Sequence, residues 1–451
     1  NIPSFYFNNT LNEDRKVVLD YTNYDKLYRQ IDITDSSDYK DIYKVLKVNK
    51  GLMINGSAGV GKSHVIKEIS KIIGEEKVAR ISFTNKASLN IQGTTIHKFL
   101  GLNEDEEISM SRIQKIKENI EYIIVDEVSM VNSKLWSLLY QVYRECNVIF
   151  LLVGDWKQIE PVEPDVKPFN YLEHPAVLSL SKNTIINLEV VYRYDNKLKE
   201  ISKDVDSIKI KDFSNKITKH NLCYTNKKRK EINNIVMDMV NKNNKEDIYY
   251  IPKFKLHKKK EEKEKDFIIR NNTSKYQDIY ISKGMPVISC ITKEGGAVAV
   301  NNEEFIIHDI NKEKIELITQ RPDGEHKIEM SITEFRRDFL LSYAITIHKS
   351  QGTTIDNKLT IWEWDKQSKK LKYTAITRAT KYENINLMGD ENLGSIDNKK
   401  TYKYKSVVIT AQKENTEKKT PIEKKKPKEK RNLKIRKFKK DGVIIERKII
   451  S

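Results

Sequence analysis

Cysteine is scarce in this chain of 451 residues. Its three cysteines, Cys146, Cys223 and Cys290, lack the spacing of metal ligands, and the eight histidines do not cluster with them. The pattern argues against a zinc site and predicts reduced thiols in an intracellular, cytoplasmic protein.

Long apolar runs are missing as well. No stretch of about 18 apolar residues occurs, and no N-terminal stretch joins a basic start to an apolar core, so we expect neither a membrane span nor a secretory signal. No internal repeat at a solenoid period is visible. The chain begins at Asn1 rather than at Met, which leaves the natural N-terminus open. Its length predicts two or three domains at ~100 to 200 residues each.

The net charge of +18 is spread unevenly. Residues 401–451 hold 18 Lys and Arg against 6 Asp and Glu, and we expect this basic tail to be largely disordered, with a short strand in 443–450. Three interpretations stay open for the tail: a solubility tail, a non-specific nucleic-acid arm, or a nuclear address. A second charged stretch, residues 253–266, is predicted to be a surface loop or a solvated helix.

A glycine-rich segment, residues 56–63, carries the chemistry that is easiest to interpret. It lies between the apolar run 51–55 and a helix-period segment that contains Val65, Ile66 and Ile69. In a phosphate-binding loop the backbone N–H groups point at phosphate oxygens, Lys62 supplies a positive charge, and Ser63 offers a hydroxyl to Mg²⁺. The predicted nucleotide-binding residues are Gly56, Ser57, Ala58, Gly59, Val60, Gly61, Lys62 and Ser63.

Further short apolar runs predict buried strands at 78–83, 122–125 and 148–153, and a helix stripe from Leu135 to Tyr143 begins after the N-cap candidate Asn132. Strands alternating with helices predict a parallel α/β sheet. Asp126 and Glu127 follow the second of these strands. An acidic pair has two roles in ATP hydrolysis, in which Asp126 would hold Mg²⁺ and Glu127 would orient and deprotonate the attacking water.

Taken in order, the motifs resemble those of the superfamily 1 helicases, in the 1B branch that includes phage Dda and RecD. The match covers roughly residues 45 to 390. Besides the phosphate loop and the acidic pair, it includes segments at 84–87, 95–97, 154–162, 188–193, 224–227, 343–354 and 373–379.

This resemblance implies two RecA-like parallel-sheet domains in tandem, with ATP between them. We expect an N-terminal segment 1–45, a first domain 46–190 with a short hairpin insertion at about 98–120, a second domain 191–400 with a β-barrel insertion at about 245–340, and the tail 401–451. An arginine supplied from the opposite domain would neutralise charge on the transferring phosphoryl group.

The resemblance also assigns residues to roles. Arg193 and Arg378 match the two arginine positions, Gln158 matches the γ-phosphate sensor, Gly352 belongs to the nucleotide site, and Tyr192 would stack on the base or pack in the core. The residues assigned to strand contact are Thr84, Asn85, Thr95, His97, Pro161, Thr225, Asn226, His348 and Ser350. Most of these are short polar side chains suited to phosphate and sugar oxygens, which implies little sequence specificity. Taken alone, His97 and His348 are more often structural histidines than strand contacts, and a purely structural role is as good an interpretation of Pro161 and Val162 as a turn with a base contact.

The sequence departs from the family pattern at two places, and each departure limits which of the family's functions we expect in this protein. Only 31 positions separate Thr95 from Asp126, where relatives insert a duplex-splitting hairpin, and residues 102–109 are acidic without an aromatic tip. Translocation is therefore a firmer expectation than unwinding. Gln30 is the only glutamine before residue 50, so a glutamine that selects adenine is not evident.

Strand-like runs at 283–290, 304–307 and 314–318, with turns at Gly295-Gly296 and Asn301-Asn302, match the place of a small β-barrel in the family, which would roof the strand channel.

The function expected from the resemblance is an ATP- and Mg²⁺-dependent DNA helicase or translocase that moves 5′ to 3′. Its partners would be single-stranded DNA, forked duplex DNA and replication proteins, with no membrane. The alternatives are an RNA helicase of the same superfamily, a nucleic-acid-stimulated P-loop ATPase without unwinding activity, and a P-loop switch or motor that acts on protein.

Overall fold

The computed structural model describes residues 27–102, 107–161, 163, 170–214, 216–252, 278–293, 296–321, 324–390 and 402–407, and the backbone of 434–440 and 443–449. Its contacts divide the chain into residues 1–408 and residues 409–451. Several predicted features lie outside the described residues, namely Val162, Gly295, the charged stretch 253–266 and the tail segment 408–433. None of the helices that the structure describes is long and apolar enough to cross a membrane.

A seven-stranded parallel sheet forms the core of the first half of the chain. Its strand order is β1 (Arg29–Ile31), β7 (Thr184–Leu188), β2 (Gly51–Gly56), β6 (Ile149–Gly154), β5 (Tyr122–Asp126), β3 (Val78–Ser82) and β4 (Thr94–Thr95). The four strands predicted from apolar runs are β2, β3, β5 and β6, and all four are confirmed.

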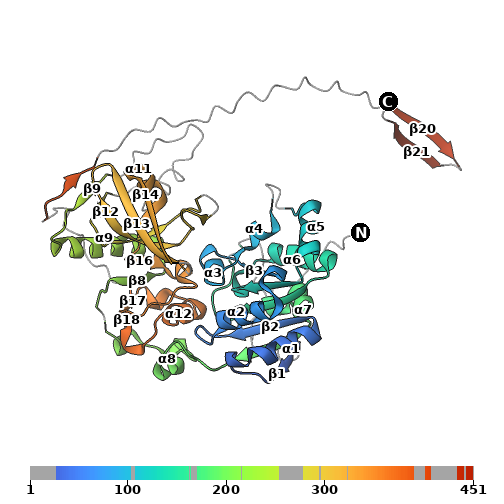
Figure 1. Ribbon diagram of the computed structural model, residues 1–451, viewed down its shortest axis with the longest axis horizontal. Coiled ribbons are helices and arrows are strands. Elements are labelled where there is room, and N and C mark those ends of the chain that lie inside the picture. Colours follow the sequence, from blue (N-terminus) through green and yellow to red (C-terminus); the bar gives the residue numbers. More distant parts are fainter. Residues whose placement is uncertain are drawn as a thin grey trace. The chain divides into compact units, whose positions relative to one another are not determined.

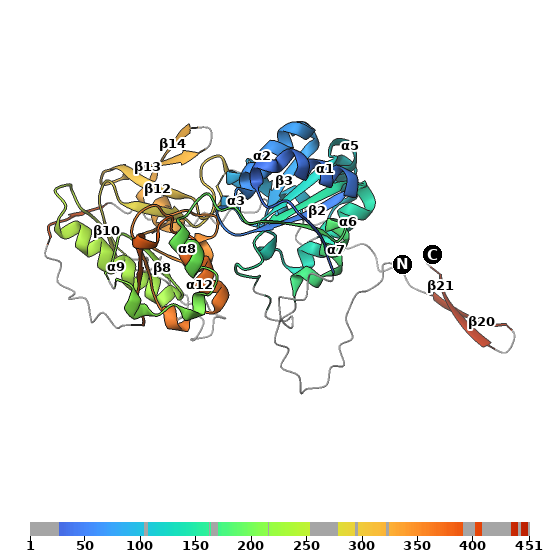
Figure 2. The ribbon, with the colours of Figure 1, turned by 90° about the horizontal axis from the view of Figure 1, so that it is seen from below.

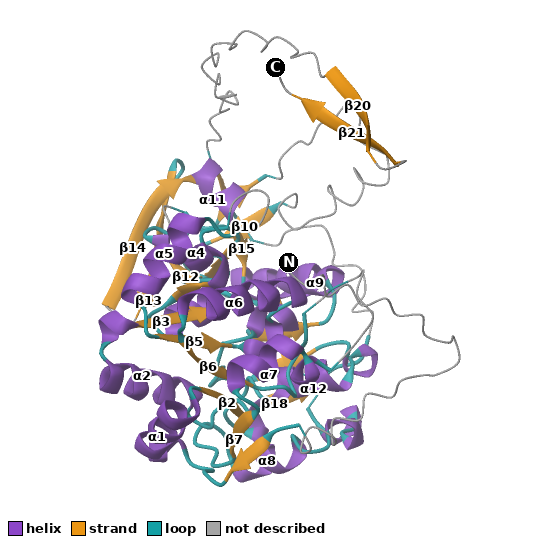
Figure 3. Ribbon diagram, turned by 90° about the vertical axis from the view of Figure 1, so that its right-hand side faces the viewer, coloured by secondary structure: helices purple, strands orange, loops and turns teal. Residues whose placement is uncertain are grey.

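Helices cover both faces of this sheet (Figures 1 and 3). Leu52 and Ile54 of β2 pack in one cluster with α1 (Tyr39–Asn49) and α2 (Lys62–Ile73). Met53, which points the other way, packs in a second cluster with α4 (Ile96–Leu100), α5 (Met110–Asn119), α6 (Ser133–Cys146) and α7 (Pro175–Ser181). A strand buried on both faces explains why these runs are continuously apolar. The predicted cap of α6 is confirmed, because Asn132 Oδ1 accepts a hydrogen bond from Leu135 N at 2.9 Å.

The segment expected to hold a hairpin, at about 98–120, contains parts of two helices and no strand among its described residues. The helix α4 ends at Leu100, and α5 begins after the N-cap Ser109; residues 103–106 lie outside the described part. The periodicity of α5 explains the difference, since Ile113 and Ile116 are spaced to bury one face of a helix against the sheet.

A second parallel sheet organises the later part of the chain. It has the order β16 (Ala344–Thr346), β8 (His220–Cys223), β17 (Leu359–Ile361) and β18 (Ile385–Leu387). Among the helices in this half are α8 (Asn196–Ile201), α9 (Asn226–Lys242) and α12 (Lys369–Ile376), seen in Figure 2. Two separate parallel sheets, each with its own apolar clusters, give the α/β fold that the sequence predicts.

The insertion predicted to be a β-barrel forms a five-stranded antiparallel sheet. Its order is β14 (Gly324–Ser331), β13 (Lys314–Arg321), β12 (Glu304–Ile310), β11 (Pro286–Ser289) and β15 (Phe339–Leu341). The end strands β14 and β15 are not paired with each other in the described residues. A β-rich insertion is therefore present, and its closure into a barrel stays a prediction.

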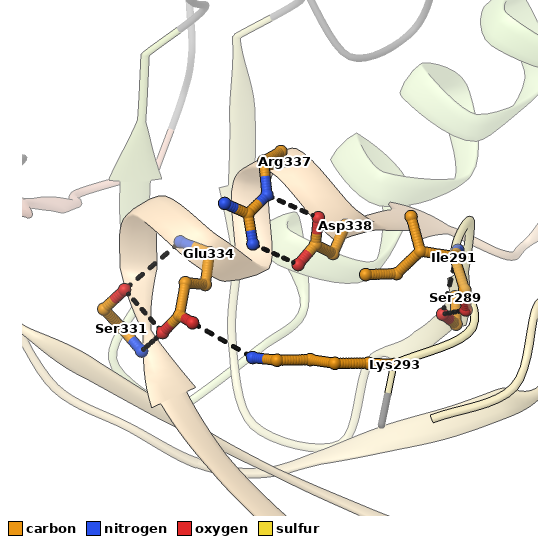
Figure 4. A network of polar contacts seen from close by, with 7 residues as sticks. All are labelled: Ser289, Ile291, Lys293, Ser331, Glu334, Arg337 and Asp338. Carbon is orange, nitrogen blue, oxygen red and sulfur yellow. Dashed lines mark hydrogen bonds and ion pairs between the residues drawn. The ribbon is translucent and has the colours of Figure 1, made fainter. Parts of the chain in front are cut away.

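A short helix, α11 (Ile332–Asp338), joins the two end strands of this sheet, and a polar network fixes it (Figure 4). Ser331 and Glu334 form a reciprocal capping box at its first turn, and Lys293 Nζ lies 3.0 Å from Glu334 Oε1. At its last turn Arg337 makes a bidentate ion pair with Asp338 at 2.7 and 2.8 Å. The network ties the loop after β11 to the connection between β14 and β15.

Two smaller sheets complete the described structure. One has the order β10 (Ile279–Ile281), β9 (Tyr249–Ile251) and β19 (Lys405–Ser406). The other is an antiparallel pair, β20 (Lys434–Lys440) and β21 (Val443–Ile449), so the strand expected near residues 443–450 is confirmed.

Candidate active site

The phosphate loop joins β2 to α2, and two glycines give it its path. Gly59 and Gly61 have φ angles of 85° and 87°, in the left-handed region that favours glycine. A Cβ at Gly59 would lie 2.3 Å from Arg193 Cβ, and one at Gly61 would lie 2.2 Å from Ser36 Oγ. Glycine is thus required at both positions for conformation and for space.

Lys62 begins α2, and its ammonium group lies against the loop. Lys62 Nζ donates hydrogen bonds to the carbonyls of Gly56 at 2.8 Å and Ser57 at 2.9 Å. Val60, in contrast, is fully buried in the apolar cluster beneath the loop. Its side chain therefore anchors the loop, and only its backbone remains available to a ligand.

The acidic pair lies at the carboxyl end of β5. Asp126 is buried, and its Oδ1 accepts a hydrogen bond from Glu127 N at 2.9 Å. Desolvation by burial, reinforced by the charge of Glu127, raises the pKa of Asp126 to about 7, although Lys62 and the backbone hydrogen bond oppose the shift. A bound divalent cation would act in the opposite direction, because its charge favours the carboxylate.

Glu127 has an unusual backbone conformation. Its φ is 53°, a left-handed value uncommon for residues other than glycine, and its Oε2 is buried without a hydrogen-bond partner in the described structure. The turn is held from below by Gly154 at the end of β6, where a Cβ would lie 2.5 Å from Val128 Cγ2. The close packing of Gly154 against Val128 thus supports the left-handed backbone of the turn that carries the Glu127 carboxylate, and such backbone strain is typical of functional sites.

These groups face one cavity of about 520 Å³, a size suited to a nucleotide. Twelve predicted site residues line it, namely Ala58, Gly59, Gly61, Lys62, Ser63, Asp126, Glu127, Gln158, Tyr192, Arg193, Gly352 and Arg378. Five residues to which the sequence analysis assigned no role also line it, namely Ser36, Ser37, His64, Ala87 and Asn90, of which Ala87 belongs to the motif segment 84–87. Residues from both parallel-sheet halves therefore converge on a single site.

The two arginines reach the cavity in different ways. Arg378 is only 2% exposed, and its guanidinium donates to the carbonyls of Thr374, Ser350 and Thr353 at 3.0, 3.4 and 3.4 Å. Arg193 is exposed, and no hydrogen bond of its side chain is found among the described residues. Desolvation lowers the pKa of both guanidiniums, and the charge of Glu127 opposes that shift in each case.

Gln158 is buried, and Asp155 fixes its orientation. Its Nε2 donates to Asp155 Oδ2 at 3.0 Å, whereas its Oε1 has no hydrogen-bond partner in the described structure. A buried amide oxygen without a partner is costly unless a ligand or water satisfies it. Gln158 and Glu127 therefore both present an unsatisfied oxygen in the lining of the cavity.

One end of the cavity is bounded by Tyr192, whose side chain is 59% exposed and donates to Asp35 through its hydroxyl. Ser36 and Ser37 lie beside it in a short turn capped by Asp35. Gln30 lies on β1 and is not among the lining residues. The sequence offered one signal for this end, since an Asp-Ser-Ser run before a helical pattern marks a cap.

The three threonines assigned to strand contact share one structural role. Thr84, Thr95 and Thr225 are the N-caps of α3 (Asn85–Asn90), α4 and α9, and each hydroxyl accepts from a backbone N–H. The Thr225 hydroxyl also donates to Glu363 Oε1 at 2.8 Å, and Thr225 N donates to Glu363 Oε2 at 2.8 Å. The Thr225 side chain is thus fully engaged within the protein.

The remaining strand-contact candidates differ in accessibility. Asn226, His97 and His348 are exposed, and Asn85 and Pro161 are partly exposed. Ser350 is fully buried and donates to the carbonyl of Ile347 at 2.8 Å, so its assigned contact with the strand stays a prediction. The structure brings two of the predicted segments together, because Lys86 Nζ donates to Thr353 Oγ1 at 2.8 Å.

Comparison with known proteins gives three kinds of match. A family model described as an AAA domain matches residues 41–164. The ATP-dependent DNA helicase Pif1 of Campylobacter jejuni is 27% identical over 400 residues, covering 73% of this chain and 86% of that protein. The ATP-dependent DNA helicase PIF1 of Saccharomyces cerevisiae is 27% identical over 194 residues, covering 38% of this chain and 23% of that protein. The chain thus spans most of the first relative and under a quarter of the second.

Solved structures share the fold at lower identity. Pif1 helicase from Candida albicans superposes with a TM-score of 0.60 at 19% identity, covering 79% of this chain and 94% of that one. Pif1 helicase from Bacteroides, solved with ADP-AlF3 and single-stranded DNA, gives a TM-score of 0.53 at 17% identity, covering 79% and 92%. Likeness at this level establishes two RecA-like domains in tandem. Together with the ordered motifs, the matched domain and these likenesses support a P-loop helicase of superfamily 1B.

Proposed function

We propose that this protein is an ATP- and Mg²⁺-dependent DNA helicase that moves 5′ to 3′ along single-stranded DNA. One observation carries the proposal: Lys62 and Glu127 of the first half share a cavity with Arg193 and Arg378, which belong to the second half. A site divided in this way lets hydrolysis change how two domains close. We take residues 46–190 and 191–400 as those domains and 401–451 as the basic tail, of which Lys405–Ser406 pairs with β9 of the second half.

The choice of DNA rests on the relatives. The matched proteins from Campylobacter jejuni and Saccharomyces cerevisiae are both named ATP-dependent DNA helicases. The direction of movement and the unwinding of forked duplex rest on the family resemblance. Replication proteins are further partners on the same basis.

The lining residues fit a nucleoside triphosphate with Mg²⁺. The loop N–H groups and Lys62 suit phosphate oxygens, and binding would exchange the contacts of Lys62 with the loop carbonyls for contacts with phosphate. No group of three or more His, Cys, Asp or Glu in the described residues could hold a metal alone. This agrees with a cation held by Ser63, Asp126 and the phosphates together, where it would neutralise developing charge.

The other side chains that line the cavity would each have a separate role in ATP hydrolysis. Glu127, with an unpartnered carboxylate oxygen, would accept a proton from the attacking water, and Gln158, with an unpartnered Oε1, would orient that water. Arg193 and Arg378 would stabilise negative charge on the transferring group, and both require the second half to be near. Hydrolysis would therefore depend on domain closure.

Arg378 also offers a path from the nucleotide to the strand. Its guanidinium holds the carbonyls of Ser350 and Thr353, which belong to the segment that carries the exposed His348. A shift of Arg378 on hydrolysis would move this segment. The exposed Asn226, at the N-terminus of α9, would contact strand phosphates in the same half.

The decisive experiment measures ATP hydrolysis with no polynucleotide, with single-stranded DNA and with single-stranded RNA. Strand separation on forked duplexes with a 5′ or a 3′ overhang follows, with Lys62→Ala as the inactive control and Lys71→Ala, an exposed change on the same helix, as the matched one. We expect stimulation by DNA and separation of the 5′-tailed fork only.

Each other outcome identifies an alternative. Equal or stronger stimulation by RNA would indicate an RNA helicase, and stimulation without strand separation would indicate a regulatory ATPase or a translocase. Hydrolysis that neither polynucleotide changes would contradict the proposal and favour a P-loop protein that acts on other proteins.

Deleting residues 411–451 tests the basic tail. We expect weaker binding to single-stranded DNA, with the largest loss at low salt, because the tail carries a large excess of Lys and Arg over Asp and Glu. The measurement is the slope of log affinity against log salt concentration, which should become shallower. Replacing Lys424, Lys425 and Lys426 by Gln in the full chain should give an intermediate slope. An unchanged slope would indicate a solubility tail.

A further inference from the structure

Asp155 joins the two halves of the protein through a buried carboxylate. It follows β6 of the first sheet and is 1% exposed. Its Oδ1 accepts from Lys157 N at 3.1 Å, and its Oδ2 accepts both from Gln158 Nε2 at 3.0 Å and from the Tyr373 hydroxyl at 3.0 Å. One oxygen is therefore shared between a cavity residue of the first half and α12 of the second.

Tyr373 is suited to be a permanent donor in this pair. Its side chain is buried, and desolvation together with the charge of Asp155 raises its pKa well above the usual value, so the hydroxyl keeps its proton. A neutral donor on a buried carboxylate forms a strong hydrogen bond, and removing it leaves the charge under-satisfied.

The helix that carries Tyr373 leads directly to Arg378. The Tyr373 carbonyl accepts from Thr377 N at 3.1 Å and from Thr377 Oγ1 at 2.9 Å, and the Thr374 carbonyl accepts from Arg378 Nε at 3.0 Å. Within little more than one helical turn, the path from Asp155 reaches the guanidinium that lines the cavity.

A second contact places the same helix against the same loop. Lys370, one turn before Tyr373, forms an ion pair with Glu160 of the loop after β6. Because residues three apart lie on the same face of a helix, this face of α12 contacts the loop after β6 at two points.

We propose that Tyr373 is a positioning residue for ATP hydrolysis. By sharing Asp155 with Gln158, it holds the orienting amide of the first half and the arginine of the second half in one arrangement. The proposal rests on the function proposed above and deepens it. It identifies the contact, Tyr373 with Asp155, that couples closure of the two halves to the orientation of the Gln158 side chain.

Tyr373→Phe removes one hydroxyl and keeps the ring. We expect kcat for DNA-stimulated hydrolysis to fall about tenfold or more, because misplacement of catalytic groups by a fraction of an ångström is costly, while KM for ATP stays within about twofold. The matched control is Tyr382→Phe in the same half, where the ring lies beside Phe213 and Lys197. That variant should keep the wild-type kcat.

A double-mutant cycle with Gln158→Ala separates positioning from packing. If Tyr373 acts through Asp155 on Gln158, the double variant should be little worse than the poorer single one. If its role is only to stabilise the fold, the two losses should multiply, and that result would overturn the inference. Wild-type kcat in Tyr373→Phe would overturn it as well.

Asp155→Asn provides a second variant should Tyr373→Phe fold poorly. It keeps the shape of the side chain and loses the oxygen that serves two donors, so we expect the same loss of kcat; an unchanged kcat would contradict the inference. Absence of DNA stimulation in the wild type would count against the helicase proposal alone, since the same comparisons of kcat can be made on basal hydrolysis.

Discussion

Replacing Glu127 by glutamine should lower the turnover of ATP by at least about 10³-fold while leaving nucleotide and strand binding intact. Glutamine has nearly the same shape, so the turn with its left-handed backbone should persist. The amide cannot accept the proton of the attacking water, because it lacks the basic carboxylate oxygen. Steady-state ATPase measurements would test the loss of turnover, and binding of a fluorescent single-stranded oligonucleotide would test whether strand binding is retained.

Glu121→Gln is the matched control for this variant. Glu121 immediately precedes β5, at the strand end opposite Glu127, and its side chain is exposed in an ion pair with Lys77. Its loss should leave hydrolysis unchanged. Wild-type turnover in Glu127→Gln would exclude this carboxylate as the base.

Arg193→Ala should reduce ATP turnover by a comparable factor, about 10³-fold or more, which is the range seen when an arginine finger is removed. The side chain is exposed and makes no hydrogen bond within the described structure, so its removal should cost the fold little. It nevertheless lies directly against Gly59 of the phosphate loop. A large loss of kcat with a normal melting temperature would therefore indicate a role in chemistry.

Two further variants delimit this role. Arg193→Lys keeps the charge and loses the planar fork, so its turnover should lie between those of the wild type and of Arg193→Ala. Arg144→Ala, a change of an exposed arginine on α6, should have no effect. If Arg193→Ala hydrolyses ATP at the wild-type rate, the guanidinium faces the cavity without taking part in the reaction.

Most of what the sequence predicted correctly depends on local pattern. The phosphate loop, the acidic pair after β5 and the cap of α6 are each determined by neighbouring residues, and the two-sided burial of β2, β5 and β6 leaves apolar runs that are easy to recognise. The order of the motifs predicted the second domain, and the two arginines that it assigned line the cavity, while their roles stay predictions.

What the sequence did not predict depends on contacts between distant residues. Tyr373 and Asp155 are 218 positions apart, and nothing in either neighbourhood indicates their hydrogen bond. Ser36 and Ser37 reach the cavity because Ser36 packs against Gly61. Ser350 appeared suited to strand contact by residue type, yet the fold buries it. Burial and pairing of this kind are decided by tertiary packing, which periodicity does not encode.

The contact between Gly59 and Arg193 has a mechanical consequence. Since a methyl group at position 59 would meet the first carbon of the Arg193 side chain, the bare backbone there sets the minimum separation of the loop and the arginine. A Cβ at position 59 would therefore increase the distance between the loop and Arg193, although it would leave every reactive group chemically unchanged. Gly59 thereby determines how closely the phosphate loop and Arg193 can approach each other.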